Sequence, residues 1–162
     1  MTEFSSMGAL ALHLAAAAAT EIKCLEKGLE QCGKHLVETM QGEIGHYQSD
    51  IGQFAAWAPL AESTEAAKAA HGYPADSPLL ASGEMQGSFS SERHGLEVIA
   101  GSKDPKMVYH EFGTLHMPPR EVVGPAVLRS KEYIRRRLGA AAVEGLIGGV
   151  AIHRLLGYDK LL

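Results

Sequence analysis

The chain has 162 residues, of which 46% are hydrophobic and 21% charged, and its formal net charge is -4. This length and composition fit one globular domain and argue against a chain that is disordered throughout. The net charge is -4 over residues 1–50, -4 over residues 51–100 and +4 over residues 101–162. This asymmetry argues against a generic nucleic-acid binder and favours a molecule with two surfaces of opposite charge.

The residue pattern predicts one long helix over residues 7–45, so residues 1–46 form the expected long-helix region. Ser5 or Ser6 is the expected N-cap. A helix of this length spans about 55 to 60 Å, which is more than a domain of this size needs. Two roles stay open: packing against other subunits, or lying across the chain's own sheet. The apolar stripe repeats in steps of three and four and consists of Ile22, Leu25, Leu29, Cys32, Leu36, Met40 and Ile44.

The two cysteines and the apolar segments indicate the cell compartment in which the chain is made. Cys24 and Cys32 lie about 12 Å apart along a helix, too far for a mutual disulfide, which favours a reducing compartment. No Lys or Arg precedes the apolar start, unlike in a secretory signal. The apolar run at residues 138–152 is broken by Glu144 and is too short to span a bilayer. We expect a chain made in the cytoplasm, without a membrane partner.

The remainder of the chain predicts mixed structure. A short helix is expected from a cap at Ser63 or Thr64 to about His71, ended by Gly72. A hairpin is expected around residues 93–95, and "KMVYHEFGT" (residues 106–114) predicts a third strand. The sequence thus predicts a single α+β domain. Its expected parts after the long helix are a loop and short helix (47–82), antiparallel strands and a Pro-rich loop (83–125), a C-terminal helix (126–150) and a tail (151–162).

Few residue patterns point to catalysis. His110, Glu111 and His116 could contribute to a metal site, but His110 and Glu111 would face opposite sides of a strand. No H-E-x-x-H, G-x-S-x-G or phosphate-loop pattern is present, and no cofactor is expected. The basic group within residues 129–137 favours a solvated face or a docking surface for an acidic neighbour over a DNA-binding stripe.

Three segments resemble a known family. "WAPLAEST" (57–64), "SPLLASGEMQGSFS" (77–90) and "VYHEFGTLHMPPREVVGPAV" (108–127) are similar to the small neck and tail-completion proteins of tailed bacteriophages. The resemblance covers about residues 7–145, and the Glu-Phe-Gly-Thr block is its most specific part. The chain departs from the family at residues 121–123, where an aromatic is common, and in the tail beyond Gly145, which has no match.

The resemblance implies a non-enzymatic virion protein made and assembled in the host bacterial cytoplasm. It implies a homo-oligomeric ring, with six subunits expected, in the neck that joins the head connector to the tail. The implied partners are other neck or connector proteins and the tail tube or tail terminator, with genomic DNA passing through the channel without sequence-specific binding. A tail terminator capping the tail tube is the close alternative. A small metal-dependent hydrolase using His110 and His116 is the alternative from another class.

The third segment carries most of the expected structural roles. On a strand, Phe112 would enter the core, while Glu111 would face a polar surface or a neighbour's base. Gly113 permits a special backbone angle, and Thr114 can bond back to the turn. Pro118 and Pro119 would stiffen the chain around Met117 and Arg120. No residue is proposed as catalytic, and the residues expected at interfaces or in structural roles are Trp57, Leu80, Gly83, Glu111, Phe112, Gly113, Thr114, Met117, Pro118, Arg120 and Pro125.

Overall fold

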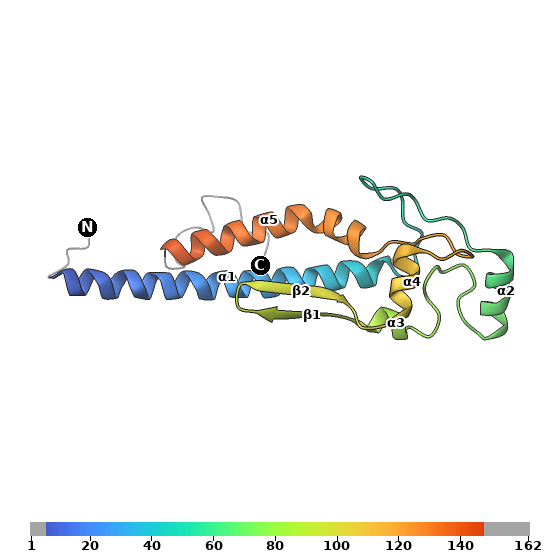
Figure 1. Cartoon of the computed structure of the whole chain (residues 1–162), viewed down its shortest axis with the longest axis horizontal. Helices are drawn as coiled ribbons and strands as arrows, with labels where there is room; N and C mark the ends of the chain where they lie inside the picture. Colours follow the sequence, from blue (N-terminus) through green and yellow to red (C-terminus); the bar gives the residue numbers. More distant parts are fainter. Residues whose placement is uncertain (1–5, 148–162) are drawn as a thin grey trace. The chain divides into compact units, whose positions relative to one another are not determined.

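The computed structural model describes residues 6–147, and the α+β class is confirmed. The tail expected at 151–162 and the end of the helix expected at 126–150 lie outside the described residues. The elements (Figure 1) are α1 (Met7–Glu43), α2 (Glu62–Ala70), α3 (Glu84–Gly87), β1 (Phe89–His94), β2 (Glu97–Ser102), α4 (Lys106–Phe112) and α5 (Val123–Ile147).

The chain divides into two compact units. The first contains the described parts of residues 1–32 and 132–162 together with residues 93–98. The second contains residues 33–92 and 99–131. The three segments that resemble the phage family all lie in this second unit, which therefore holds the candidate site.

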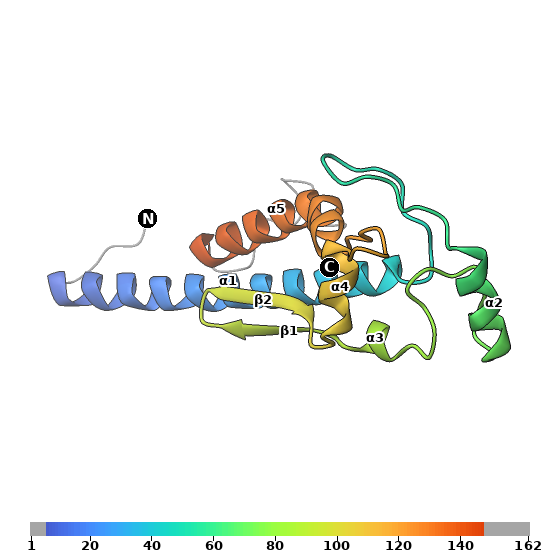
Figure 2. The same ribbon diagram turned by 45° about the vertical axis from the view of Figure 1, so that its right-hand side comes forward.

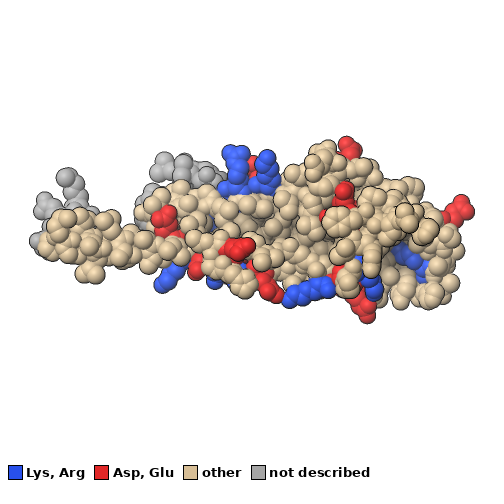
Figure 3. Space-filling model, in the orientation of Figure 1, with Lys and Arg blue, Asp and Glu red and all other residues tan. Residues whose placement is uncertain are grey.

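Helix α1 confirms the long helix expected at the start of the chain. The Ser6 hydroxyl accepts a hydrogen bond from the Ala9 amide at 3.2 Å and so caps the helix. Residues 7–20 include no Lys, Arg, Asp or Glu, and this part of α1 is tan throughout on the face shown in Figure 3. Most of its side chains are exposed, Met7, Leu12 and Leu14 among them. The first turns of α1 therefore present an uncharged surface without cover from the described residues.

Close helix packing begins further along α1, within the first unit. A Cβ added at Gly28 would lie 2.8 Å from the Cβ of Ala141 on α5, so glycine lets the two helices approach there. Buried Arg137 of α5 donates a side-chain hydrogen bond to Gln31 of α1. The thiols of Cys24 and Cys32 are not joined in a disulfide, as their spacing predicted.

The core of the second unit draws on most of its elements. Apolar side chains that are separated widely in the sequence pack into one cluster, which holds the end of α1 and the starts of α4 and α5 against β1. Its buried members are Met40, Ile44, Trp57, Phe89, Met107, Val122 and Ala126.

The predicted hairpin is confirmed, but the predicted third strand is wrong. Strands β1 and β2 form a two-stranded antiparallel sheet (Figure 2), and Gly95 between them has φ +59°. Residues 106–112 form α4 instead of a strand. The side chain of Asp104 accepts the Lys106 amide at 2.9 Å, Pro105 precedes the helix with helical angles, and Gly113 follows it with φ +71°. Asp-Pro before a helix and Gly after it are ordinary boundary signals.

Two other expected helix starts are also wrong. Helix α2 begins at Glu62 and makes no side-chain cap, so Ser63 and Thr64 lie inside its first turn. Helix α5 begins at Val123, three residues before the expected Ala126. Pro125 is tolerated in this first turn because the amide it lacks would have no helical partner there.

Candidate assembly site

The three segments that resemble the phage family meet in space. The indole Nε1 of Trp57 donates to the Glu121 carbonyl at 3.1 Å. The Arg120 guanidinium donates to the carbonyls of Ala58 at 3.1 Å and Pro59 at 3.3 Å. The first segment is thus fastened to the third by hydrogen bonds to backbone oxygens. Leu80 of the second segment packs against the same core that buries Trp57.

Glu111 has a structural role different from the one expected. Glu111 is half-buried in a helix and does not lie on a strand. Its carboxylate accepts the amides of Val122 at 2.9 Å and Val123 at 3.2 Å. These are orphan N–H groups at the start of α5, and a carboxylate is well placed there because the helix dipole is positive at this end. Glu111 therefore locks α4 to the beginning of α5.

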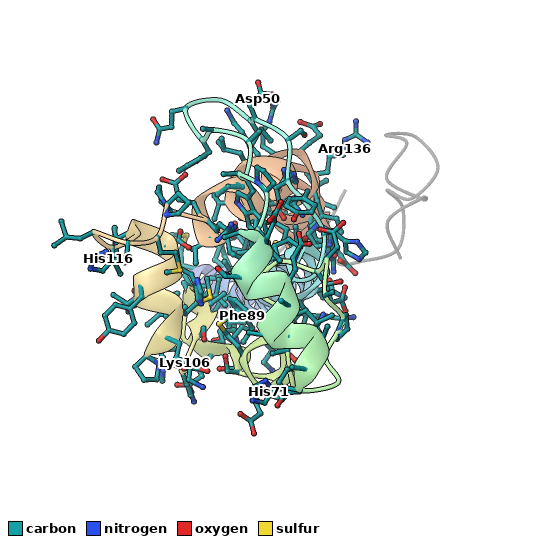
Figure 4. All side chains as sticks on the ribbon, turned by 90° about the vertical axis from the view of Figure 1, so that its right-hand side faces the viewer. Asp50, His71, Phe89, Lys106, His116 and Arg136 are labelled. Carbon is teal, nitrogen blue, oxygen red and sulfur yellow. The ribbon has the colours of Figure 1, made fainter. Side chains whose placement is uncertain are left out.

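The residues after α4 form a tight turn. Thr114 and Met117 exchange backbone hydrogen bonds of 2.9 and 3.3 Å, and the Thr114 hydroxyl accepts the His116 amide at 3.3 Å. Gly113 has φ +71°, and an added Cβ would lie 2.9 Å from the Pro119 nitrogen. The special backbone angle of Gly113 and the turn bond of Thr114 are thus confirmed. Figure 4 shows His116 on the ribbon that follows α4, while Lys106 marks the start of that helix.

Phe112 is not a core residue, and its exposure defines a surface. Helical spacing turns Met107 and Glu111 inward, so Val108 and Phe112 face outward. The exposed fractions are 56% for Val108, 59% for Tyr109, 79% for Phe112 and 99% for Leu115. We call these four residues the α4 surface. Large apolar side chains gathered on one surface mark a contact with another molecule more often than chance exposure does.

A cavity of about 500 Å³ is lined by all three family-like segments. Residues 59–61 come from the first segment and residues 79–81 from the second. The third contributes residues 116–118 together with His110 and Arg120. The segments therefore have a common structural role, which is to build this cavity beside α4.

The other expected site residues have mainly structural positions. Gly83 has φ +85° immediately before α3, an angle that favours glycine. Pro125 is buried, Met117 is half-buried and Pro118 is exposed. Sequence reasoning missed Val108 and Tyr109 because it assigned their segment to a strand, and it missed Leu115 in the turn that follows. The Asp-Pro and Gly signals around α4 would have found the helix and its outer face.

The two histidines considered for a metal site both line the cavity. Burial lowers the pKa of His110, and the neighbouring Arg120 cation lowers it further. Over residues 6–147, no group of three or more His, Cys, Asp or Glu side chains is placed to hold one metal ion. The hydrolase alternative therefore has two candidate ligands and lacks a third in the described part of the chain.

A buried ion pair lies within the second unit. Glu43 at the end of α1 is 4% exposed, and one carboxylate oxygen accepts a hydrogen bond from Arg129 of α5. Burial raises the pKa of Glu43 to about 7; Arg129 opposes this rise and the charge of Glu111 adds to it. Glu43 is therefore a group that changes charge near neutral pH.

Helix α1 is also long and apolar enough to cross a membrane, judged by length and composition alone. Its most apolar stretch is not buried in the structure.

No family model, no curated protein and no solved structure matches the chain.

Proposed function

We propose that this chain is a non-enzymatic structural protein of a tailed bacteriophage, which forms a ring in the neck and joins the head connector to the tail. The proposal begins with the resemblance of three segments to neck and tail-completion proteins. It is supported by the way these segments meet around one cavity, with the α4 surface beside it. The α4 surface is the observation that carries the proposal.

The α4 surface suits a contact with another subunit. Four large apolar side chains are exposed within eight residues, and they include both aromatic residues of α4. Aromatic residues are enriched at protein interfaces because each removes much apolar area from water at little entropic cost. Glu111 and Gly113 hold this surface in a fixed shape, so little ordering entropy would be lost on binding.

The charge distribution favours head-to-tail association. In a closed ring every subunit presents one face to its neighbour on one side and a different face on the other. The net charge of -4 over residues 1–50, -4 over 51–100 and +4 over 101–162 would let acidic and basic regions meet at successive contacts. The uncharged start of α1 would supply a second apolar contact, between subunits or with a partner protein.

The tail terminator remains the alternative within the same class, since it would use the same kind of ring. Binding to the tail tube without binding to connector proteins favours the terminator, whereas binding to connector proteins favours the neck. Flotation with vesicles of phosphatidylcholine and phosphatidylglycerol tests the exposed start of α1. Co-flotation of the chain would count against a purely virion role.

The proposal is tested by assembly of paired variants. Phe112→Ser combined with Leu115→Ser removes the two most exposed side chains of the α4 surface. Leu96→Ser on the hairpin, where Leu96 is 55% exposed, is the matched control. We expect electron micrographs to show rings of fixed symmetry for the wild type and the control, alone or with connector and tail proteins. The double variant should stay monomeric in sedimentation velocity with an unchanged circular dichroism spectrum. Assembly of the double variant like the wild type, or a wild type indifferent to every partner, would refute the proposal.

A further inference from the structure

The cavity beside α4 has a cationic part and an apolar part. Lys68 and Arg120 provide cations, and Leu79, Leu80 and Met117 provide apolar walls. No Asp or Glu is among the described residues that line it. A cavity with two cations and no acid of its own has an electrostatic preference for anions.

Arg120 is a buried cation with no counterion among residues 6–147. It is 6% exposed, and in the described part of the chain it forms no ion pair. Its terminal nitrogen donates to two carbonyl oxygens, and its Nε has no partner there. Carbonyl dipoles offset only part of the free energy lost when a charge leaves water, so an anion close to Arg120 would be stabilised.

Lys68 is the second cation of the cavity. Its ammonium group donates to the Ser77 carbonyl, and an ammonium has three donors, so two stay available. Burial lowers the pKa of Lys68, an effect that the charges of Asp76 and Glu65 oppose. Neither carboxylate lines the cavity.

The histidines of the cavity add polar groups. Because burial and Arg120 lower the pKa of His110 against the opposing charge of Asp104, its imidazole is neutral at pH 7. His116 is exposed at the turn after α4 and lines the same cavity. Neutral imidazoles can donate hydrogen bonds to an anion without supplying charge.

We propose that this cavity binds a carboxylate carried on a short aliphatic chain. The carboxylate would meet Lys68 and Arg120, and the aliphatic chain would lie against Leu79, Leu80 and Met117. The volume of about 500 Å³ is within the range of small-ligand sites. The same chemistry is offered by a free small carboxylic acid and by an acidic side chain of a second copy of this chain. The site does not depend on the proposed ring function.

The first experiment measures binding of hexanoate to the purified full chain by calorimetry, with 1-hexanol as the uncharged match. We expect hexanoate to bind about tenfold more tightly than 1-hexanol, and Lys68→Met to weaken hexanoate binding about tenfold, because each change removes one charge from the contact. Lys131→Met, an exposed lysine of α5 outside the cavity, should leave the affinity unchanged.

Arg120→Met should also weaken hexanoate binding, provided that the variant keeps the wild-type circular dichroism spectrum. Lys68→Met is the deciding variant, because Lys68 is less buried than Arg120 and its replacement disturbs the fold less. Three outcomes would overturn the proposal: equal affinity for hexanoate and 1-hexanol, equal affinity of wild type and Lys68→Met, or no hexanoate binding at millimolar concentrations.

The second experiment identifies the source of the carboxylate by sedimentation velocity with and without hexanoate. If the cavity takes an acidic side chain of a second copy, hexanoate and Lys68→Met should both shift the chain toward monomer. If it takes a free small carboxylate, self-association should be unaffected while hexanoate still binds. Either result supports the carboxylate site. If the ring proposal alone were refuted, the binding of hexanoate would still be valid evidence for the site.

Discussion

Replacing Glu111 by alanine tests the connection between α4 and α5. The Glu111 carboxylate accepts the amides of Val122 and Val123, and Val122 is fully buried. Without the carboxylate, the Val122 amide has no access to water in the present packing. We therefore expect Glu111→Ala to destabilise the second unit measurably, although Glu111 belongs to no apolar core.

The magnitude follows from the lost hydrogen bonds. A hydrogen bond to a charged acceptor contributes about 1.5 to 3 kcal/mol, and loss of a helix cap costs about 1 kcal/mol. The amide of half-buried Val123 can bond to water in the variant, so the expected loss is smaller than the sum of the two hydrogen-bond contributions. We expect Glu111→Ala to lower the free energy of unfolding by about 3 kcal/mol, and Glu111→Gln, which keeps one acceptor oxygen, to lower it by roughly half of this.

The assay is urea unfolding followed by circular dichroism, with amide hydrogen exchange of the first turn of α5 as the local measurement. Glu38→Ala is the control, because Glu38 is an exposed carboxylate on α1 and its loss should change stability by less than about 0.5 kcal/mol. A Glu111→Ala variant as stable as the Glu38→Ala control, with unchanged exchange at Val122, would show that this cap does not stabilise the protein.

Two further predictions concern pH and backbone conformation. Because the pKa of Glu43 is raised to about 7 from 4.5, its proton stabilises the folded state; this contribution is complete below about pH 4.5 and is lost as pH rises through about 7. The free energy of unfolding should thus fall by about 3 kcal/mol over this window, and Glu43→Gln should flatten that fall; equal slopes for both proteins would contradict the assignment. Gly113→Ala should destabilise the protein by about 1 to 3 kcal/mol, since φ is +71° and the Pro119 nitrogen is 2.9 Å from the added Cβ. Gly42→Ala, in the open helical part of α1, should stabilise it by about 1 kcal/mol, and thermal melts that reversed this order would refute both arguments.

The elements that the sequence predicts well are those whose signals are local. The three-and-four spacing of apolar residues and the Ser6 hydroxyl are enough for α1, and the hairpin needs only two short β-favouring runs with Gly95 between them. The roles of Gly113 and Thr114 could likewise be predicted, because glycine favours a positive φ and a threonine hydroxyl favours a hydrogen bond within its own turn.

The strand prediction failed because it followed residue type and not the Asp-Pro and Gly boundary signals, which agree with the distant contacts of this segment. Val108, Tyr109 and Phe112 favour a strand by type, yet the segment is helical, because this places Met107 in the core and Glu111 at the start of α5. The sequence could not predict the cavity, because the cavity depends on contacts between distant segments. Arg120 bonds to Ala58, 62 positions earlier, and nothing in either segment alone indicates the other.

Trp57 gives the second unit a built-in optical probe. It is the single tryptophan among the 162 residues, so ultraviolet emission excited at the indole comes from one place. Its ring is buried, and its Nε1 is bonded to the carbonyl of Glu121, the residue next to Arg120. The emission wavelength therefore reports the polarity around the start of α5, and opening of that junction would appear as a red shift in a sample too dilute for other methods.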